Sequence, residues 1–203
     1  MSWIALKGKC RTCNHPISYL YPFIEILTCL LLSLLYLTIN HHYFGAYCIF
    51  ISALIVTIRS DIETMLISRF ATLYCAPIGF VASIFAYLPI TPLESITGAF
   101  SGYFFLYAIN ALFKKVRHKN GMGEGDFELL FLIGAFTGII GCWTTLTIGS
   151  ALGSLYGIIH LLYCSYTNHG ATPLQTKIPF GPFLAAGVLI HIFYGEQIFY
   201  LLT

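Results

Sequence analysis

The chain of 203 residues contains only two aspartates, Asp61 and Asp126, and they are its first candidates for chemistry. Hydrolysis of a peptide bond without a metal or a nucleophilic side chain needs two carboxyl groups that share one proton. The ionised carboxylate activates a water molecule, and the protonated one donates to the substrate carbonyl. Placing like charges close together separates their pKa values in this way. Asp61 and Asp126 are therefore the candidate catalytic pair.

Glycines precede the second aspartate, in the order Gly123, Glu124, Gly125, Asp126. Because glycine has no Cβ atom, its backbone can approach a bound peptide closely and can adopt positive φ. Gly123 and Gly125 are therefore candidate substrate-binding residues. For each aspartate taken alone, helix capping at a water interface is the better explanation, since Asp is a favoured N-cap residue.

Cys10 and Cys13 have the spacing of a zinc knuckle and are the candidate metal ligands. A closed structural zinc site needs four ligands. His15 is a candidate third ligand, but a fourth is not evident, so we do not expect an intact zinc site. The remaining cysteines lie in or beside apolar segments, where we expect them to pack as small apolar residues: Cys29, Cys48, Cys75, Cys142 and Cys164.

The elements that must position these residues are membrane helices. The chain is 58% hydrophobic and 9% charged, with a mean hydropathy of +0.81, whereas soluble domains carry about 25% charged residues. Its apolar blocks approach the ~20 residues that cross a bilayer. We predict an all-α polytopic membrane bundle, with a short cytoplasmic segment at 1–19 and a transmembrane peptidase domain at 20–203. The seven expected spans are 20–39, 43–58, 70–90, 95–113, 128–144, 146–167 and 181–202.

The fifth and sixth spans are the least clearly separated, because residues 129–167 form one charge-free run. We place the break between them at 141–144. Gly98, Gly134 and Gly138 belong to four-residue glycine repeats, which allow membrane helices to pack closely. The first 19 residues lack the apolar core of a signal peptide, so we expect the first span to stay in the membrane.

The basic residues orient the bundle. Lys and Arg in short loops mark the cytoplasmic side, and with seven spans all ten of them fall on one side. The N-terminus is then cytoplasmic, and both aspartates lie at the cytoplasmic face. No nucleotide-binding loop or basic stripe with interleaved aromatic residues is visible, so nucleic acid is not an expected partner. The ten residues are Lys7, Lys9, Arg11, Arg59, Arg69, Lys114, Lys115, Arg117, Lys119 and Lys177.

A resemblance joins these features. Gly123-Glu124-Gly125-Asp126 matches the Gly-x-Gly-Asp motif of membrane aspartic proteases, and its surroundings resemble those in the type IV prepilin peptidases. Three further segments resemble the same family in the same order. They are Cys10-Arg11-Thr12-Cys13 with Pro16-Ile17-Ser18 and Tyr21-Pro22-Phe23-Ile24-Glu25, then Asp61 with Met65-Leu66-Ile67, and then Ile178-Pro179-Phe180-Gly181-Pro182-Phe183.

The resemblance implies an aspartic endopeptidase of the bacterial inner membrane in which Asp61 and Asp126 are catalytic. Its implied partners are membrane lipid and prepilins or pseudopilins, whose short basic leader it removes at the cytoplasmic face. Proteolysis of this kind needs no cofactor. Members that also N-methylate use S-adenosylmethionine and carry a second Cys-x-x-Cys pair for zinc. This chain begins near one pair only, so we do not expect methyl transfer.

The chain departs from the family pattern at two places. Ile67-Ser68-Arg69 stands where Ile-Pro-Asp is common, and Glu128 stands where a Lys usually follows the second aspartate. We expect Glu128 to add a negative charge beside the pair and to raise its apparent pKa. The departures leave open a catalytically degenerate scaffold of the same fold. A different Gly-x-Gly-Asp protease, such as a preflagellin peptidase, is a second alternative.

Acidic residues also gather on the expected cytoplasmic side. Glu124 is a candidate substrate-binding residue, because acidic side chains there would attract the basic leader. The alternative is that these residues are solvated interface charges. A transporter is disfavoured, since transport sites place ionisable residues near the middle of the bilayer. The acidic residues on this side, besides the two aspartates, are Glu25, Glu63, Glu124 and Glu128.

Overall fold

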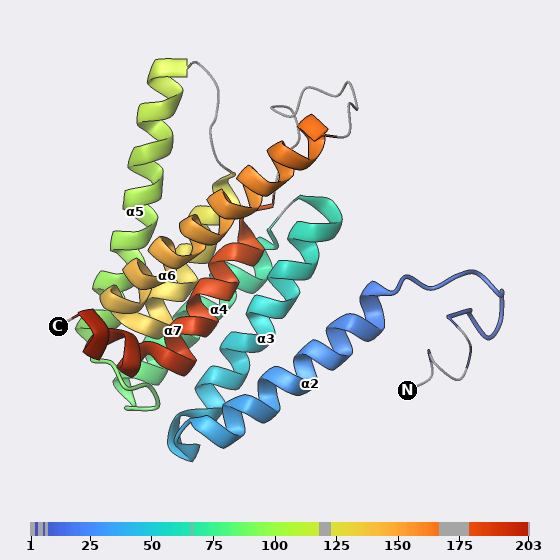
Figure 1. The fold of residues 1–203 in the computed structure, drawn as a ribbon. Coiled ribbons are helices and arrows are strands. Elements are labelled where there is room, and N and C mark those ends of the chain that lie inside the picture. Colours follow the sequence, from blue (N-terminus) through green and yellow to red (C-terminus); the bar gives the residue numbers. More distant parts are fainter. Residues whose placement is uncertain are drawn as a thin grey trace.

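The computed structural model describes residues 3, 6, 8–65, 67–117, 123–166 and 179–202. The predicted all-α bundle is confirmed, and the only β-bridge in the described residues joins Lys9 to Pro16. Several residues of the sequence arguments lie outside this part of the chain, namely Lys7, Leu66, Lys119, Gly121, Met122, Lys177 and Ile178. The helices are α2 (Leu20–Thr38), α3 (His41–Thr64), α4 (Arg69–Ile84), α5 (Pro92–Arg117), α6 (Glu124–Tyr166) and α7 (Gly181–Leu202) (Figure 1).

In the part of the chain that the structure describes, four helices are long and apolar enough to cross a membrane, which fits a polytopic bundle. They are α2, α3, α5 and α6, whereas α4 and α7 contain the shorter apolar stretches Ala71–Ile84 and Gly181–Gly195. The expected span at 70–90 is too long, because the helix ends at Ile84 and Ala86 has a positive φ of 56°. A non-glycine residue in that region interrupts a helix.

Helix α6 has 43 residues and breaks at Gly138, whose φ of 70° and ψ of −171° are not helical. The predicted break at 141–144 is therefore wrong by a few residues. Only glycine adopts this backbone conformation readily. A Cβ built on Gly102 of α5 would lie 2.6 Å from Sγ of Cys142 and 3.0 Å from Cγ of Leu130. Since these two residues lie on either side of the break, α5 packs against the first arm of α6 and against the start of the second.

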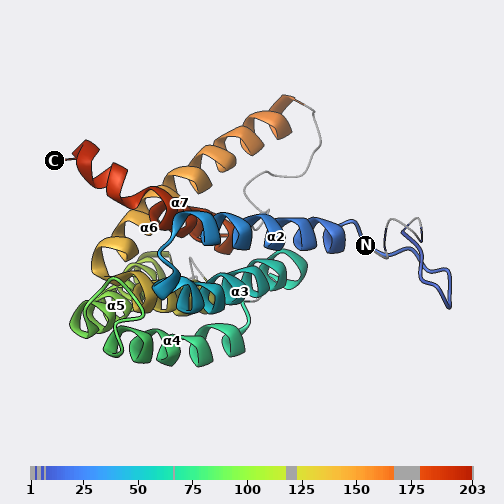
Figure 2. The same ribbon diagram turned by 90° about the horizontal axis from the view of Figure 1, so that it is seen from below.

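Close packing of glycines holds the break in place. A Cβ built on Gly98 of α5 would overlap the backbone of Gly138, and one built on Gly134 would overlap the backbone of Gly98. The predicted structural role of these glycines is confirmed. Seen from below, α4 and α5 lie along one side of the bundle and the second arm of α6 extends away from them (Figure 2).

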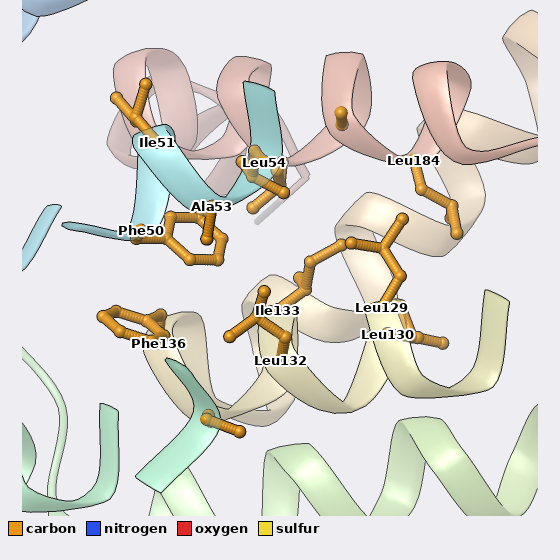
Figure 3. Packing of buried hydrophobic residues seen from close by; sticks show 14 of the residues in the cluster. Phe50, Ile51, Ala53, Leu54, Leu129, Leu130, Leu132, Ile133, Phe136 and Leu184 are labelled. Carbon is orange, nitrogen blue, oxygen red and sulfur yellow. The ribbon is translucent and has the colours of Figure 1, made fainter. Parts of the chain in front are cut away.

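The first arm of α6 forms the centre of the core. Phe136 stacks on Phe50 of α3 with 4.7 Å between the ring centroids, and Leu184 of α7 packs into the same cluster (Figure 3). A helix that is apolar all round is expected to be buried. The fully buried residues of this arm are Leu129, Leu130, Leu132, Ile133, Ala135 and Phe136. Asp126 precedes this segment by less than one turn, so the core fixes its position.

Candidate active site

Asp61 lies on the buried face of α3. Phe50, Leu54, Thr57 and Asp61 follow one another at three- and four-residue steps, which places them on one side of a helix. All four are buried, and Asp61 is only 6% exposed. The apolar stripe that packs α3 into the bundle thus carries the carboxyl group inward in the last turn of the helix.

A backbone amide from the far end of the sequence meets this carboxyl group. The N–H of Gly181 donates to Oδ2 of Asp61 at 3.0 Å, across 120 positions of the chain. Gly181 begins α7, where backbone N–H groups lack helical partners and carry partial positive charge. The capping alternative is therefore realised in part, since Asp61 serves the N-terminus of α7 rather than of its own helix.

Asp126 lies in the first turn of α6, two residues after the helix begins at Glu124. It is 8% exposed, and its N–H donates to the carbonyl oxygen of Gly123 at 3.3 Å. Its carboxyl group interacts electrostatically with that of Asp61. Two helices far apart in the sequence thus bring the only two aspartates into one buried place.

The glycines before Asp126 have different surroundings. A Cβ built on Gly125 would lie 2.5 Å from Cβ of Ile67, so the loop between α3 and α4 fills that space. A Cβ built on Gly123 would meet only Oδ2 of Asp126, at 3.7 Å. Gly123 is therefore the more open of the two toward a bound peptide, whereas Gly125 allows the packing of Ile67.

An arginine links the acidic residues around Asp126. Arg69, the first residue of α4, contacts Glu124 through Nη2 and Glu128 through Nε, both at 2.9 Å. The hydroxyl of Thr72 donates to Oε2 of Glu128 at 3.4 Å. Sequence reasoning missed this cluster, although it singled out Arg69 and Glu128 as departures. The negative charge expected from Glu128 is thus balanced by the other departing residue.

Cys10 and Cys13 lie in a tight turn near the N-terminus. The N–H of Asn14 donates to the carbonyl oxygen of Cys10 at 3.1 Å, and the N–H of Cys10 to that of His15 at 2.9 Å. Hydrogen bonds from the Thr12 side chain and from backbone amides lower the pKa of the Cys10 thiol to about 6. Thiolates suit zinc, but within the described residues no third His, Cys, Asp or Glu side chain joins them. The donor set is incomplete for a closed site.

Comparison with known families adds to this geometry. Residues 48–158 match the type IV leader peptidase family, a range that contains both aspartates. Residues 1–39 match the bacterial peptidase A24 N-terminal domain. No solved structure matched the chain.

Curated relatives match along nearly the whole chain. A protein of Aeromonas salmonicida named prepilin leader peptidase/N-methyltransferase is 32% identical over 98% of this chain and 66% of its own length. A protein of Xanthomonas campestris with the same name is 34% identical over 97% of this chain and 67% of its own. The corresponding protein of Pseudomonas aeruginosa is 32% identical over 98% and 66%. The chain thus spans about two thirds of the length of these relatives.

Proposed function

This chain belongs to the type IV leader peptidase family, and from this premise we propose that it is a membrane aspartic endopeptidase with Asp61 and Asp126 as its catalytic pair. The observation that carries the proposal is the burial of both carboxyl groups in one place, where the charge of Asp61 acts on Asp126. The proposed substrates are prepilins or pseudopilins, the class in the names of its relatives.

The two carboxyl groups would have different roles. Asp61 accepts the Gly181 N–H at the positive end of α7, which favours its ionised form. We assign Asp61 as the base that takes a proton from water. Asp126 also receives a backbone hydrogen bond, from Gly123, but its burial and the neighbouring charge of Asp61 act more strongly and favour its protonated form. Asp126 is therefore assigned as the acid that protonates the carbonyl oxygen of the scissile bond.

The reaction then balances within the pair. One proton of the water passes to Asp61, and the remaining hydroxide adds to the carbonyl carbon. At the same time the proton of Asp126 passes to the carbonyl oxygen, which gives a diol. In the second step the new C–O bond stays, the C–N bond breaks, and the proton held by Asp61 passes to the leaving amine. One hydroxyl proton of the diol returns to Asp126, so the pair ends as it began.

The proposed topology has seven spans, with the N-terminus in the cytoplasm of a bacterial cell. At about 1.5 Å per residue, the 43-residue α6 measures about 65 Å, twice the thickness of a bilayer core. Its break at Gly138 lets the two arms count as separate spans. The C-terminal end of α3 and the N-terminal ends of α4, α6 and α7 share one end of the bundle (Figure 1). The positive-inside rule assigns that end to the cytoplasm.

Leader binding is the proposed role of the exposed acid beside the pair. The Glu124 side chain is 77% exposed even though Arg69 contacts it. A basic leader would find this carboxylate, and the open side of Gly123, next to Asp126. We expect Glu124→Gln to weaken leader binding and to reduce its dependence on salt. Unchanged binding and an unchanged salt dependence would remove Glu124 from the substrate site.

The test of the proposed function is leader removal in cells that co-express this chain with a candidate prepilin, followed by gel shift. Asp61→Asn and Asp126→Asn keep the side-chain size and remove the shared proton. Each is expected to lower cleavage by roughly 100-fold to 10,000-fold, the usual contribution of an acid or base. Glu94→Gln is the matched control, because Glu94 lies at the other end of the bundle and caps α5 through Thr91.

Cleavage by the wild type and the control, but by neither Asn variant, would establish the pair. Absence of cleavage by well-folded wild type, across several prepilins, would favour a degenerate scaffold instead. Cleavage that survives in either Asn variant would refute the assignment of that aspartate.

A further inference from the structure

Arg69 joins the two acidic residues that come before and after Asp126 in the sequence. Its Nη2 contacts Oε2 of Glu124 and its Nε contacts Oε1 of Glu128, both at 2.9 Å. Glu124 and Asp126 lie in the first turn of α6, and Glu128 follows one turn after Glu124 on the same side of the helix. A planar guanidinium can hold two carboxylates at once in fixed directions, which a lysine cannot do. Arg69 thus spans the turn that carries Asp126.

The contact with Glu128 lies in a nearly closed environment. The Glu128 side chain is only 10% exposed, and Thr72 donates to its second carboxylate oxygen. A buried carboxylate without a partner is strongly unfavourable, so Glu128 depends on Arg69 for its charge balance. Exposed ion pairs matter far less, and in the contact with Glu124 both side chains are mostly exposed, at 64% and 77%. The Glu128 contact is therefore the important one.

The same arginine connects the two halves of the candidate pair. Arg69 follows the short loop after α3, the helix that carries Asp61. In that loop, Ile67 packs where a Cβ of Gly125 would otherwise lie. The segment from Asp61 to Arg69 thus packs against the turn of α6 that holds Asp126. Loss of the ion pairs of Arg69 would weaken the packing of this segment against α6.

The charged groups around Asp126 come from several helices. Asp61 approaches from α3 and acts on the charge of Asp126. Glu124 and Glu128 share the opposite side of α6, because two-residue steps point to opposite sides of a helix, and Arg69 reaches them there from α4. Helix α5 contributes Tyr103, which packs edge-on against Phe127. Residues 179–185, which lead into α7 and form its first turn, contain no titratable side chain. Arg69 is thus the one cation among the described residues of this group.

We propose that Arg69 is a positioning residue, which through Glu124 and Glu128 fixes both the place of Asp126 and the charge around it. The proposal rests on the function proposed above. Asp126, the proposed acid of the pair, thereby has a supporting cation on a different helix, α4. Without Arg69, the carboxylates of Glu124 and Glu128 would stay uncompensated on the two turns of α6 that also carry Asp126, and the shared proton would be held up to higher pH.

The experiment follows the pH profile of prepilin cleavage by the purified protein in lipid. Arg69→Gln is expected to reduce cleavage by roughly ten- to one-hundred-fold. It is also expected to move the pH range of cleavage upward by about one unit, which is the low end of an arginine's effect on a nearby carboxyl group. Arg69→Asp is expected to reduce it further. Glu128→Lys, which sets two cations beside each other, is expected to move the range downward.

The double variant Arg69→Asp with Glu128→Lys restores an ion pair of opposite polarity. We expect it to recover cleavage to within about fivefold of wild type and to return the pH profile, as interaction between neighbouring residues allows. Lys115→Glu is the matched control, since Lys115 is an exposed cation in the last turn of α5. It is expected to change neither quantity.

Two results would overturn the proposal. One is a double variant that, although folded, cleaves no better than the weaker single variant. The other is a pH profile identical to wild type in Arg69→Gln, because a merely structural role lowers activity without moving the profile.

A second measurement separates this proposal from the proposed function. Dicyclohexylcarbodiimide modifies protonated carboxyl groups, so the pH at which it labels Asp126 reports the same charge environment without catalysis. An upward move of that pH in Arg69→Gln supports the positioning role even if wild type cleaves no prepilin. An unchanged labelling profile refutes the role even if wild type is an active peptidase.

Discussion

The N–H of Gly181, at the first position of α7, donates a 3.0 Å hydrogen bond to Oδ2 of Asp61 in the last turn of α3. The approach is so close that a Cβ built on Gly181 would lie 2.7 Å from the same oxygen. Real Cβ atoms do not come this near to a carboxylate oxygen that must keep its place. Position 181 therefore requires glycine because a side chain would not fit beside the Asp61 carboxylate, and not because glycine has greater backbone freedom.

Gly181→Ala is the first prediction from this contact. The variant is expected to fold, with thermal stability lowered by the loss of one buried hydrogen bond to Asp61. Cleavage should nevertheless fall by roughly ten- to one-hundred-fold, because the new methyl group displaces the Asp61 carboxylate. Gly157→Ala in α6 is the control, as a Cβ there would meet nothing within 4 Å. Equal activity of the two variants would contradict the role of Gly181.

Gly125 and Ile67 provide a second prediction. Because a Cβ on Gly125 would lie 2.5 Å from Cβ of Ile67, Gly125→Ala is expected to reduce both stability and cleavage. Adding Ile67→Ala makes room for the methyl group and should recover much of the activity. Gly123→Ala, which is sterically allowed, should fold normally. If Ile67→Ala gave no recovery in the double variant, direct contact of Gly125 with substrate would be the better explanation.

The third prediction concerns the thiol of Cys10, whose pKa is lowered to about 6, first by the Thr12 side chain and then by backbone hydrogen bonds. A lowered pKa means that the thiolate, the reactive form, is present above pH 6 and lost below it. Iodoacetamide labelling of Cys10 should thus rise through about pH 6 and level off by pH 7. Thr12→Val is expected to move this rise to higher pH, whereas Thr12→Ser keeps the hydroxyl and should leave it in place. Mass spectrometry of the labelled peptide measures both.

Much of the site could be predicted because local patterns encode it. The three- and four-residue steps of Phe50, Leu54, Thr57 and Asp61 place the carboxyl group on the buried face of α3. The uniform apolar character that follows Asp126 predicts a buried helix. These features need no knowledge of how the helices are arranged.

The parts that could not be predicted depend on contacts between distant segments. Nothing near Asp61 indicates that the amide of Gly181, 120 positions away, will reach it. Arg69 and Glu128 each looked like a departure, and only their contact shows that they balance each other. The break in α6 was misplaced for a related reason, since many glycines could end a helix and only packing against Gly98 selects Gly138.

The fourth prediction tests whether α6 crosses the membrane twice. If its arms are separate spans that meet at Gly138, the two ends of α6 lie on the cytoplasmic side and the break lies outside. Alkaline phosphatase, which is active only outside the cytoplasm, should then be active when fused after Ile140. A fluorescent protein that folds only in the cytoplasm should be bright when fused after Arg117 and after Tyr166. The same phosphatase fused after Tyr87, beyond α4, is the positive control for the outer side.

Phosphatase activity after Tyr166 would mean that α6 crosses once and that the chain has one span fewer than proposed. The C-terminal end of α6 and the start of α7 would then lie across the membrane from Asp126, which the contact of Gly181 with Asp61 does not allow. The fusion after Tyr166 therefore tests the topology and the assembly of the catalytic pair together.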